Sequence, residues 1–328
     1  MAKFIIKLAC FVGLIAALDL ALSRLLDWGR PPDYAAFVDS KSKYDNLEQV
    51  DLLFIGDSQT ADGFVPSVFK EKLGATAFNY GVYQLSPFEG YFLLKDLVSR
   101  HDHPPKLVVL GTDVQMFHYR IGDGRYSPLF IESPQNLIPL IIESDNLGAI
   151  TAAGRKKYLF PGLIKRLMNS PVGAEMRREV RRIENGYLLN EKHYSDLSQF
   201  DCEKDRGFFS PVPVEKQREY FLKTIAFLQQ HNIPCVIANP PMQKNFLAGM
   251  KQKAAYQEFQ QALAEISSRY SVAVFNANHD LLLDNLQDED FLDGDHLCFT
   301  GAEKFSASFA DYLLRQGFPG NTRIASLD

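Results

Sequence analysis

The sequence predicts an α/β fold in which a doubly wound parallel sheet of five strands carries helices on both faces. Two observations predict it. Short apolar runs rich in branched and aromatic residues recur along the chain, as buried parallel strands require. Helical patterns separate these runs, and such alternation produces right-handed crossovers. The strands are expected at 51–56, 76–81, 106–111, 233–239 and 272–277.

The helices between these strands are expected at 66–73, 87–100, 215–230 and 254–270. A last helix is expected to run through Ala302 to Leu314, with Thr300 as its N-cap and Glu303 as the partner in a capping box. The interval from about 115 to 213 offers no comparable strand and is too long for a simple connection. We therefore expect a helical insertion after strand three, forming a wall or lid at the carboxyl edge of the sheet.

The amino terminus has the pattern of a membrane anchor. Lys3 and Lys7 precede an apolar run to about Leu22 that only Asp19 interrupts. This pattern favours an uncleaved signal anchor over residues 1–26, with the lysines held in the cytoplasm and the rest exported. A buried helix of the globular domain is the alternative. We expect a linker at 27–48, the main domain at 49–318 and a tail at 319–328.

The charge of the chain bears on its partners. A net charge of -5 over 328 residues argues against a nucleic-acid binder. One window is basic, with nine Lys or Arg and two Glu between positions 155 and 182, and it lies beside the apolar run "NLIPLII". This window is expected either to contact anionic lipid or an acidic polymer, or to be a solvated helix face.

Polar residues and glycines follow the first three strands. Ser58 lies at the turn after strand one, Asn79 and Gly81 end strand two, and Asp113 follows strand three. In the flavodoxin-like order 2-1-3-4-5, strands two and three flank strand one, so these residues converge on Ser58. Ser58 is then a candidate nucleophile, and Gly81 can present a backbone N–H at close approach. A capping serine and an ordinary turn glycine are the alternatives.

The run "LDGDHL" places Asp293 three residues before His296, after the fifth strand. On the same sheet edge as Ser58, this pair is expected to supply a general base and its orienting carboxylate. A polar segment that leads into the last helix is the alternative. Asp295 is the second choice for the carboxylate and is expected to point elsewhere if the turn is tight. The pair His101 and His103 precedes two prolines and is expected in a solvated loop. No metal and no organic cofactor is expected.

Four blocks in this order, "FIGDSQ", "NYG", "LGTDV" and "LDGDHL", resemble the SGNH (GDSL) hydrolases. The resemblance spans strand one to the last helix without the insertion. It implies Ser58 as nucleophile and first oxyanion donor, Gly81 as second donor, and His296 with Asp293 as the base pair. The carboxyl-terminal block is most similar to the membrane-anchored members, such as the D-alanyl transfer protein and the alginate acetyltransferase proteins.

One block departs from the family pattern. Family members commonly carry an asparagine as the third oxyanion donor, where this chain has Asp113. An ionised aspartate cannot donate a hydrogen bond, so the third donor is expected to be missing, to be a protonated Asp113, or to be replaced by one of Thr112, Gln115 and Asn79. Asn79, Gln59 and Asn239, all near the active edge, are expected to contact substrate.

The resemblance implies an exported, membrane-anchored serine esterase or O-acyltransferase that forms an acyl-serine and acts on envelope polysaccharide or related esters. It also implies a single-pass protein of the inner (cytoplasmic) membrane with an extracytoplasmic domain, working beside a multi-pass membrane acyltransferase. A plain carboxylesterase or lipase is the close alternative. A catalytically inactive domain that binds polysaccharide or acts as a scaffold is the alternative from another class, motivated by Asp113.

Overall fold

The computed structural model describes residues 1–28, 32–121, 127–145, 183–188, 213–279 and 285–320, together with positions 151, 156, 159, 163 and 164. Five parallel strands form one sheet in the order β2-β1-β3-β6-β7. This confirms the predicted fold class and strand order. The strands are β1 Leu52–Gly56, β2 Ala77–Gly81, β3 Leu107–Gly111, β6 Cys235–Asn239 and β7 Ala273–Asn276.

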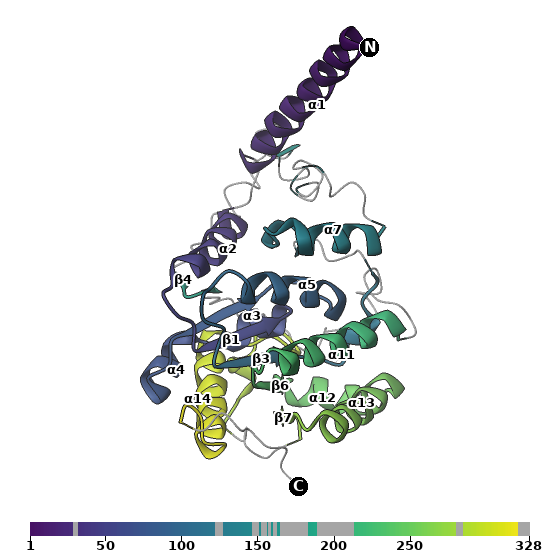
Figure 1. Cartoon of the computed structure of the whole chain (residues 1–328). Helices are drawn as coiled ribbons and strands as arrows, with labels where there is room; N and C mark the ends of the chain where they lie inside the picture. Colours follow the sequence, from purple (N-terminus) through teal and green to yellow (C-terminus); the bar gives the residue numbers. More distant parts are fainter. Residues whose placement is uncertain are drawn as a thin grey trace.

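Helices cover both faces of the sheet (Figure 1). Because side chains alternate along a strand, Phe54 packs in one core and Leu53 in the other. The Phe54 core includes helices α4 and α14, and the Leu53 core includes α5, α11 and α13. The main helices are α3 Ser58–Gly63, α4 Pro66–Leu73, α5 Pro87–Val98, α11 Glu215–Gln230, α12 Lys244–Met250, α13 Ala254–Tyr270 and α14 Phe299–Arg315, with 3₁₀ turns η2 Met116–His118 and η7 Asp288–Asp290.

The last helix begins earlier than expected. Cys298 is the N-cap of α14 and makes no side-chain capping bond. Thr300, the expected cap, lies inside the first turn, and its hydroxyl donates to Asp290 at 3.4 Å. The expected capping box is therefore wrong, because buried Asp290 attracts both Thr300 and the ammonium of Lys304, at 2.7 Å.

The interval between β3 and α11 contains helices α6 Ser127–Phe130 and α7 Pro134–Glu143. It also contains a short antiparallel hairpin that the sequence pattern did not predict, β4 Ile183–Glu184 paired with β5 Tyr187–Leu188. The hairpin lies on the edge strand β2, where the Asn79 N–H donates to the Asn185 carbonyl at 2.8 Å. Most of the rest of the expected insertion lies outside the described residues.

The amino-terminal segment forms helix α1 Ala2–Trp28, which is long and apolar enough to cross a membrane and buries none of its apolar window. Helix α1 projects from the globular part (Figure 1). Helix α2 Pro32–Ser42 and a 3₁₀ turn η1 Lys43–Asn46 occupy the middle of the interval expected as a linker. The side chains of Lys41 and Tyr44 from this segment are fully buried. Residues 321–328 of the expected tail lie outside the described residues.

Lys41 joins this segment to the edge of the sheet. Its ammonium donates to the carbonyl of Asn79 and, at 3.0 Å, to that of Gly186 in the hairpin. It also lies over the rings of Phe37 and Tyr80, at 4.7 and 5.2 Å from their centroids. Burial lowers the pKa of Lys41 well below its usual value, although the charge of Asp62 opposes this. One side chain thus holds α2, β2 and the insertion hairpin together.

Candidate active site

The first candidate residue is Ser58, at the turn from β1 into α3. Asp57 is the N-cap of α3, and its Oδ1 accepts the N–H of Gln59 at 3.1 Å. Because Asp57 caps the helix, the Ser58 hydroxyl is not needed for that task. Ser58 Oγ instead lies 2.8 Å from Nε2 of His296, which is 238 residues away in the chain.

A tight loop presents His296. Asp293 Oδ1 accepts the backbone N–H groups of Asp295 and His296, at 3.1 and 2.9 Å. The loop is closed by Leu292, whose N–H donates to the His296 carbonyl at 2.8 Å. An aspartate that bonds the backbone two and three residues on is a common way to fix such a turn. The short spacing of the Asp-x-x-His run thus sets the carboxylate beside the imidazole.

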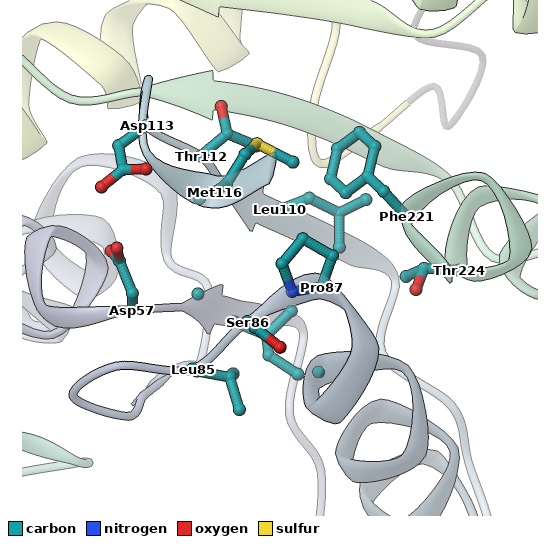
Figure 2. A pocket seen from close by; sticks show the side chains of 14 residues that line it. Asp57, Leu85, Ser86, Pro87, Leu110, Thr112, Asp113, Met116, Phe221 and Thr224 are labelled. Carbon is teal, nitrogen blue, oxygen red and sulfur yellow. The ribbon is translucent and has the colours of Figure 1, made fainter. Parts of the chain in front are cut away.

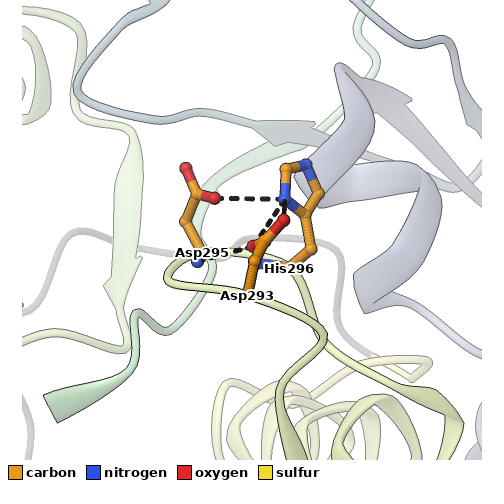
Figure 3. A group of neighbouring side chains, drawn as sticks. All are labelled: Asp293, Asp295 and His296. Atoms are coloured by element: carbon orange, nitrogen blue, oxygen red, sulfur yellow. Dashed lines mark hydrogen bonds and ion pairs between the residues drawn. The ribbon is translucent and has the colours of Figure 1, made fainter. Parts of the chain in front are cut away.

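Both aspartates of the loop face the imidazole (Figure 3). His296 Nδ1 lies 2.9 and 3.0 Å from the two oxygens of Asp293, and both contacts are hydrogen bonds. Asp295 Oδ1 lies 3.1 Å from the same nitrogen, but with poorer geometry, since that oxygen has no hydrogen bond. Asp295 was expected to point elsewhere, and that expectation is wrong because the turn folds its side chain back onto the ring.

The two carboxylates favour a charged imidazole. Burial lowers the pKa of His296, but the charge of Asp295 and the hydrogen bond to Asp293 raise it more, so the pKa lies well above the usual histidine value. Burial raises the pKa of Asp293, and the hydrogen bond to His296 lowers it more, to about 2. The geometry thus supports a Ser-His-Asp arrangement whose base holds its proton to a higher pH than an isolated histidine.

Behind the imidazole lies a buried network of acidic groups that the sequence did not reveal. Gln59 Nε2 donates to Asp295 Oδ2 at 3.1 Å and lies 3.4 Å from Asp113 Oδ2. Asp113 is hydrogen-bonded to Asp57, which also accepts the hydroxyl of Tyr119 at 3.1 Å. Two hydrogen-bonded carboxyls must share a proton. Burial and the charge of Asp57 raise the pKa of Asp113 well above its usual value.

Two of the expected oxyanion donors are bonded within the protein. The N–H of Gly81 donates to Asn79 Oδ1 at 2.9 Å. Asp113 accepts the N–H of Gln115 at 2.8 Å and bonds Asp57, as above. Gly81 does lie against α3, since a Cβ there would stand 2.3 Å from the Ala61 nitrogen. In this structure Gly81 therefore allows α3 to lie close to β2. Of the three expected oxyanion donors, only Ser58 has its backbone N–H in the first turn of a helix.

The three side chains expected to contact substrate are buried. Asn79 is fully buried and donates to the carbonyls of Thr60, Ala61 and Phe64, so it holds α3 to β2. Asn239 is fully buried and donates to Asn276 Oδ1 at 3.0 Å across two strands. Gln59 belongs to the acidic network and is 3% exposed. In this structure all three side chains are engaged inside the protein, because polar side chains at a strand end can also bond groups behind the site.

Of the substitutes considered for the third oxyanion donor, two are already engaged. Asn79 donates into α3, and the hydroxyl of Thr112 donates to the Ala238 carbonyl at 3.4 Å. Gln115 is half-buried, and its side chain makes no hydrogen bond to the residues that the structure describes. Of the three substitutes, only Gln115 therefore leaves its side-chain amide unengaged among the described residues.

The three loop residues Asp293, Asp295 and His296 also form a cluster that could ligate a cation, with ligand atoms within 4.8 Å of one another. The contacts between Nδ1 and the two oxygens of Asp293, 2.9 and 3.0 Å long, have the length of hydrogen bonds. A metal here would take Nδ1 from Asp293 and remove the bond that orients the ring. These three residues can therefore either serve as an acid-base group or bind a metal, but they cannot do both at once.

A cavity lies on the other side of the acidic pair (Figure 2). In that view the carboxyls of Asp57 and Asp113 point toward each other at its border. Leu85, Leu110, Met116 and Phe221 make its walls largely apolar. Because neither Ser58 nor His296 is among its described lining residues, this cavity borders the network behind the candidate site rather than the reacting groups.

Comparisons with known proteins add little to this geometry. No protein-family model matches the sequence, and no curated protein matches it. One solved structure, described as a candidate platelet activating factor from Streptococcus pneumonia, is 16% identical, with 93% of this chain and 99% of that chain covered and a TM-score of 0.39. At that TM-score the likeness carries no argument. The fold and site themselves define a doubly wound α/β protein with a Ser-His-Asp constellation at the carboxyl edge of its sheet.

Proposed function

We propose that this chain is a serine esterase or O-acyltransferase that forms an acyl enzyme on Ser58. The observation that carries the proposal is the unbroken chain of contacts from Ser58 Oγ through the His296 ring to Asp293, 2.8 Å on one side and 2.9 Å on the other. Such a constellation is recognised by geometry and roles rather than by position in a fold. The resemblance of four sequence blocks to SGNH hydrolases supports the same reading.

The reaction has two steps. Ser58 Oγ attacks the ester carbonyl carbon while Nε2 of His296 takes the hydroxyl proton, and Asp293 holds the imidazolium through Nδ1–H. Collapse of the tetrahedral species breaks the bond to the leaving alcohol, which receives that proton from Nε2. In the second step a water or an acceptor hydroxyl gives its proton to Nε2 of His296 and attacks the acyl carbon; the bond to Ser58 Oγ then breaks, and Oγ takes that proton back from Nε2. Water makes the protein an esterase, and a sugar hydroxyl makes it a transferase.

The setting of the reaction is also proposed. Helix α1 would span the inner membrane once, with Lys3 and Lys7 on the cytoplasmic side and the sheet domain outside. The resemblance to anchored acyl-transfer proteins favours an acylated envelope glycan as substrate and a multi-pass membrane acyltransferase as partner. A soluble carboxylic ester would suit a plain carboxylesterase or lipase equally well.

A second candidate function has its own observation. Gly81 and Asp113 both bond groups within the protein, and loss of an oxyanion donor costs about 3 kcal/mol in the transition state. A domain that binds polysaccharide without turnover needs no such donors. The two candidates differ in whether Ser58 ever becomes covalently modified.

Activity of the purified full chain in detergent against p-nitrophenyl acetate and acetylated sugars tests the proposal. Ser58→Ala and His296→Ala should each abolish turnover to the same extent, since members of a triad act as a unit. Ser308→Ala, on the exposed side of α14, is the matched control and should retain turnover. Activity that persists in EDTA separates the triad from a metal at the loop cluster. Turnover that survives in Ser58→Ala would overturn the proposal, and acyl transfer to an added glycan would identify a transferase.

A further inference from the structure

A hydrogen bond joins the two residues that adjoin the candidate nucleophile and its base. Gln59 directly follows Ser58, and Asp295 directly precedes His296. Gln59 Nε2 donates to Asp295 Oδ2 at 3.1 Å, across 236 residues of chain. Among the described residues, α3 and the loop of residues 292–297 are thus joined by two hydrogen bonds, this one and the bond between Ser58 and His296. A displacement of the loop along α3 would have to break both.

Other contacts hold the loop's own shape without touching α3. Asp293 accepts two backbone N–H groups of the loop, at 3.1 and 2.9 Å. The carbonyl of Gly294 accepts the N–H of Gln243 at 2.9 Å, which ties the loop to the segment before α12. Neither contact fixes where the imidazole stands relative to Ser58. That relation depends on the bond from Gln59.

Gln59 is itself held in place on the α3 side. Its backbone N–H donates to Asp57 Oδ1 at 3.1 Å, and its Nε2 also lies 3.4 Å from Asp113 Oδ2. Its oxygen Oε1 is buried and has no hydrogen-bond partner among the described residues, and a buried oxygen without a partner costs stability. The two donors of the amide, each directed at a carboxyl, therefore account for this side chain better than a gain in stability does.

The two bonds between α3 and the loop differ once the reaction starts. When Ser58 Oγ carries the acyl group, it has no proton and cannot donate to Nε2 of His296. Gln59 and Asp295 do not react, so the bond between them persists in the acyl enzyme. His296 must still stand where it can take a proton from the incoming water or acceptor hydroxyl. At that stage, Gln59 supplies the side-chain bond that remains between α3 and the loop.

We propose that Gln59 is a positioning residue for the reaction on Ser58, which holds the loop of His296 against α3 through Asp295 while the acyl group leaves the serine. This inference rests on the proposed function, because it assigns a part in that same reaction. A displacement of the reacting groups by about 1 Å can cost about 10²-fold in rate. Loss of the bond should therefore slow the release of the acyl group more than its attachment.

Gln59→Met tests this role on the full chain in detergent, with p-nitrophenyl acetate as the probe. Methionine is unbranched like glutamine and fills the same space without a donor. At the plateau of the pH profile, steady-state turnover should fall about 10²-fold. Acetylated Ser58 should accumulate, seen as a burst of p-nitrophenol and by mass spectrometry. The matched control is Asn136→Leu, which removes another buried amide that donates to an aspartate, Asp96, at 3.4 Å; it should keep wild-type turnover without a burst.

A double-mutant cycle with Asp295→Ala shows whether Gln59 acts through Asp295. Each single variant should lose turnover by a similar factor, and the double variant should lose no more than either, because the same bond is removed in all three. Asp295→Asn keeps an acceptor for Gln59 Nε2 and should not accumulate the acyl enzyme. Losses that multiply in the double variant, or wild-type turnover without a burst in Gln59→Met, would overturn the positioning role.

The same variants separate this inference from the proposed function. Urea unfolding follows the cycle without any substrate, and non-additive losses of stability there show that the two side chains interact. A wild type that turns over, with no kinetic coupling between Gln59 and Asp295, would overturn the positioning role and leave the proposed function intact. A wild type that neither turns over nor reacts with a fluorophosphonate would refute both, even where the coupling in unfolding persists.

Discussion

Asp295 and His296 are neighbours in the chain whose side chains meet, with Oδ1 3.1 Å from Nδ1. This contact adds a second negative charge to an imidazole that Asp293 already holds. A general base works only when it is neutral, so kcat/KM should rise with pH through the pKa of His296, which lies above the usual value near 6.5.

Asp295→Asn should lower that pKa, because the charge of Asp295 is the largest of the contacts that raise it. The variant would then be more active than the wild type at mildly acidic pH. The pH profile of kcat/KM for p-nitrophenyl acetate measures it. An unchanged profile would show that Asp295 does not act on His296.

Asp293→Asn should behave differently from Asp295→Asn. Asp293 fixes the loop through two backbone N–H groups and orients the ring. Loss of that orientation costs on the order of 10⁴-fold in kcat in a serine protease triad, and we expect about 10³-fold or more here at every pH. If Asp295→Asn causes the larger loss, the roles of the two carboxylates are reversed.

Gly81→Ala tests the packing of α3 against β2. The new Cβ would stand 2.3 Å from a backbone nitrogen of Ala61, so the helix that begins at Ser58 must shift. We expect the free energy of unfolding to fall by about 3 kcal/mol and turnover to fall with it. The matched control is Gly249→Ala in α12, where a Cβ meets nothing within 4 Å and stability should rise by about 0.5 to 1 kcal/mol. Equal effects in urea unfolding would contradict the account.

Asp113→Asn tests whether Asp113 shares a proton with Asp57 in the folded chain. Because the pKa of Asp113 is raised in the folded chain, the stability it contributes is present below its unfolded value near 3.9 and is lost as pH rises through its folded pKa. The wild type should therefore lose stability relative to the variant as the pH rises above about 4. Urea unfolding at several pH values measures this difference, and a constant difference would exclude a titrating Asp113.

Lys41→Met tests a pH dependence of stability that is opposite in sign to the one expected from Asp113. A lysine whose pKa is lowered by burial binds fewer protons in the folded chain, so stability rises with pH between its folded pKa and about 10.4. The variant should lack this rise while filling the same space. Lys72→Met, whose ammonium is partly exposed and paired with Asp311, should keep the rise. The same slope in Lys41→Met would mean that burial does not lower the pKa of Lys41.

The fold class and strand order could be predicted because each strand is a short local run of apolar residues. Ser58 and the pair Asp293 and His296 could be singled out for a similar reason, since each lies in a compact motif. The network through Gln59 could not, because it joins groups that lie 54 and 236 residues apart. Nothing in a single run of residues encodes such a contact.

The structure also differs from the sequence-based expectations where tertiary contacts, rather than the local sequence, determine the conformation. The Pro-rich and polar stretch after α1 forms α2 because the aromatic rings near Lys41 and the carbonyls of Asn79 and Gly186 hold it. The hairpin at 183–188 is only two residues per strand, too short for a periodic signal. Asn79 was expected to face substrate, yet its amide fits the carbonyls of α3.

The proposed function requires that His296 activates the Ser58 hydroxyl. Incubating the full chain with a fluorophosphonate and locating the adduct by mass spectrometry measures this activation. We expect a phosphonylated Ser58 in the wild type and no adduct in His296→Ala. A folded wild-type chain that carries no adduct at Ser58 would contradict it.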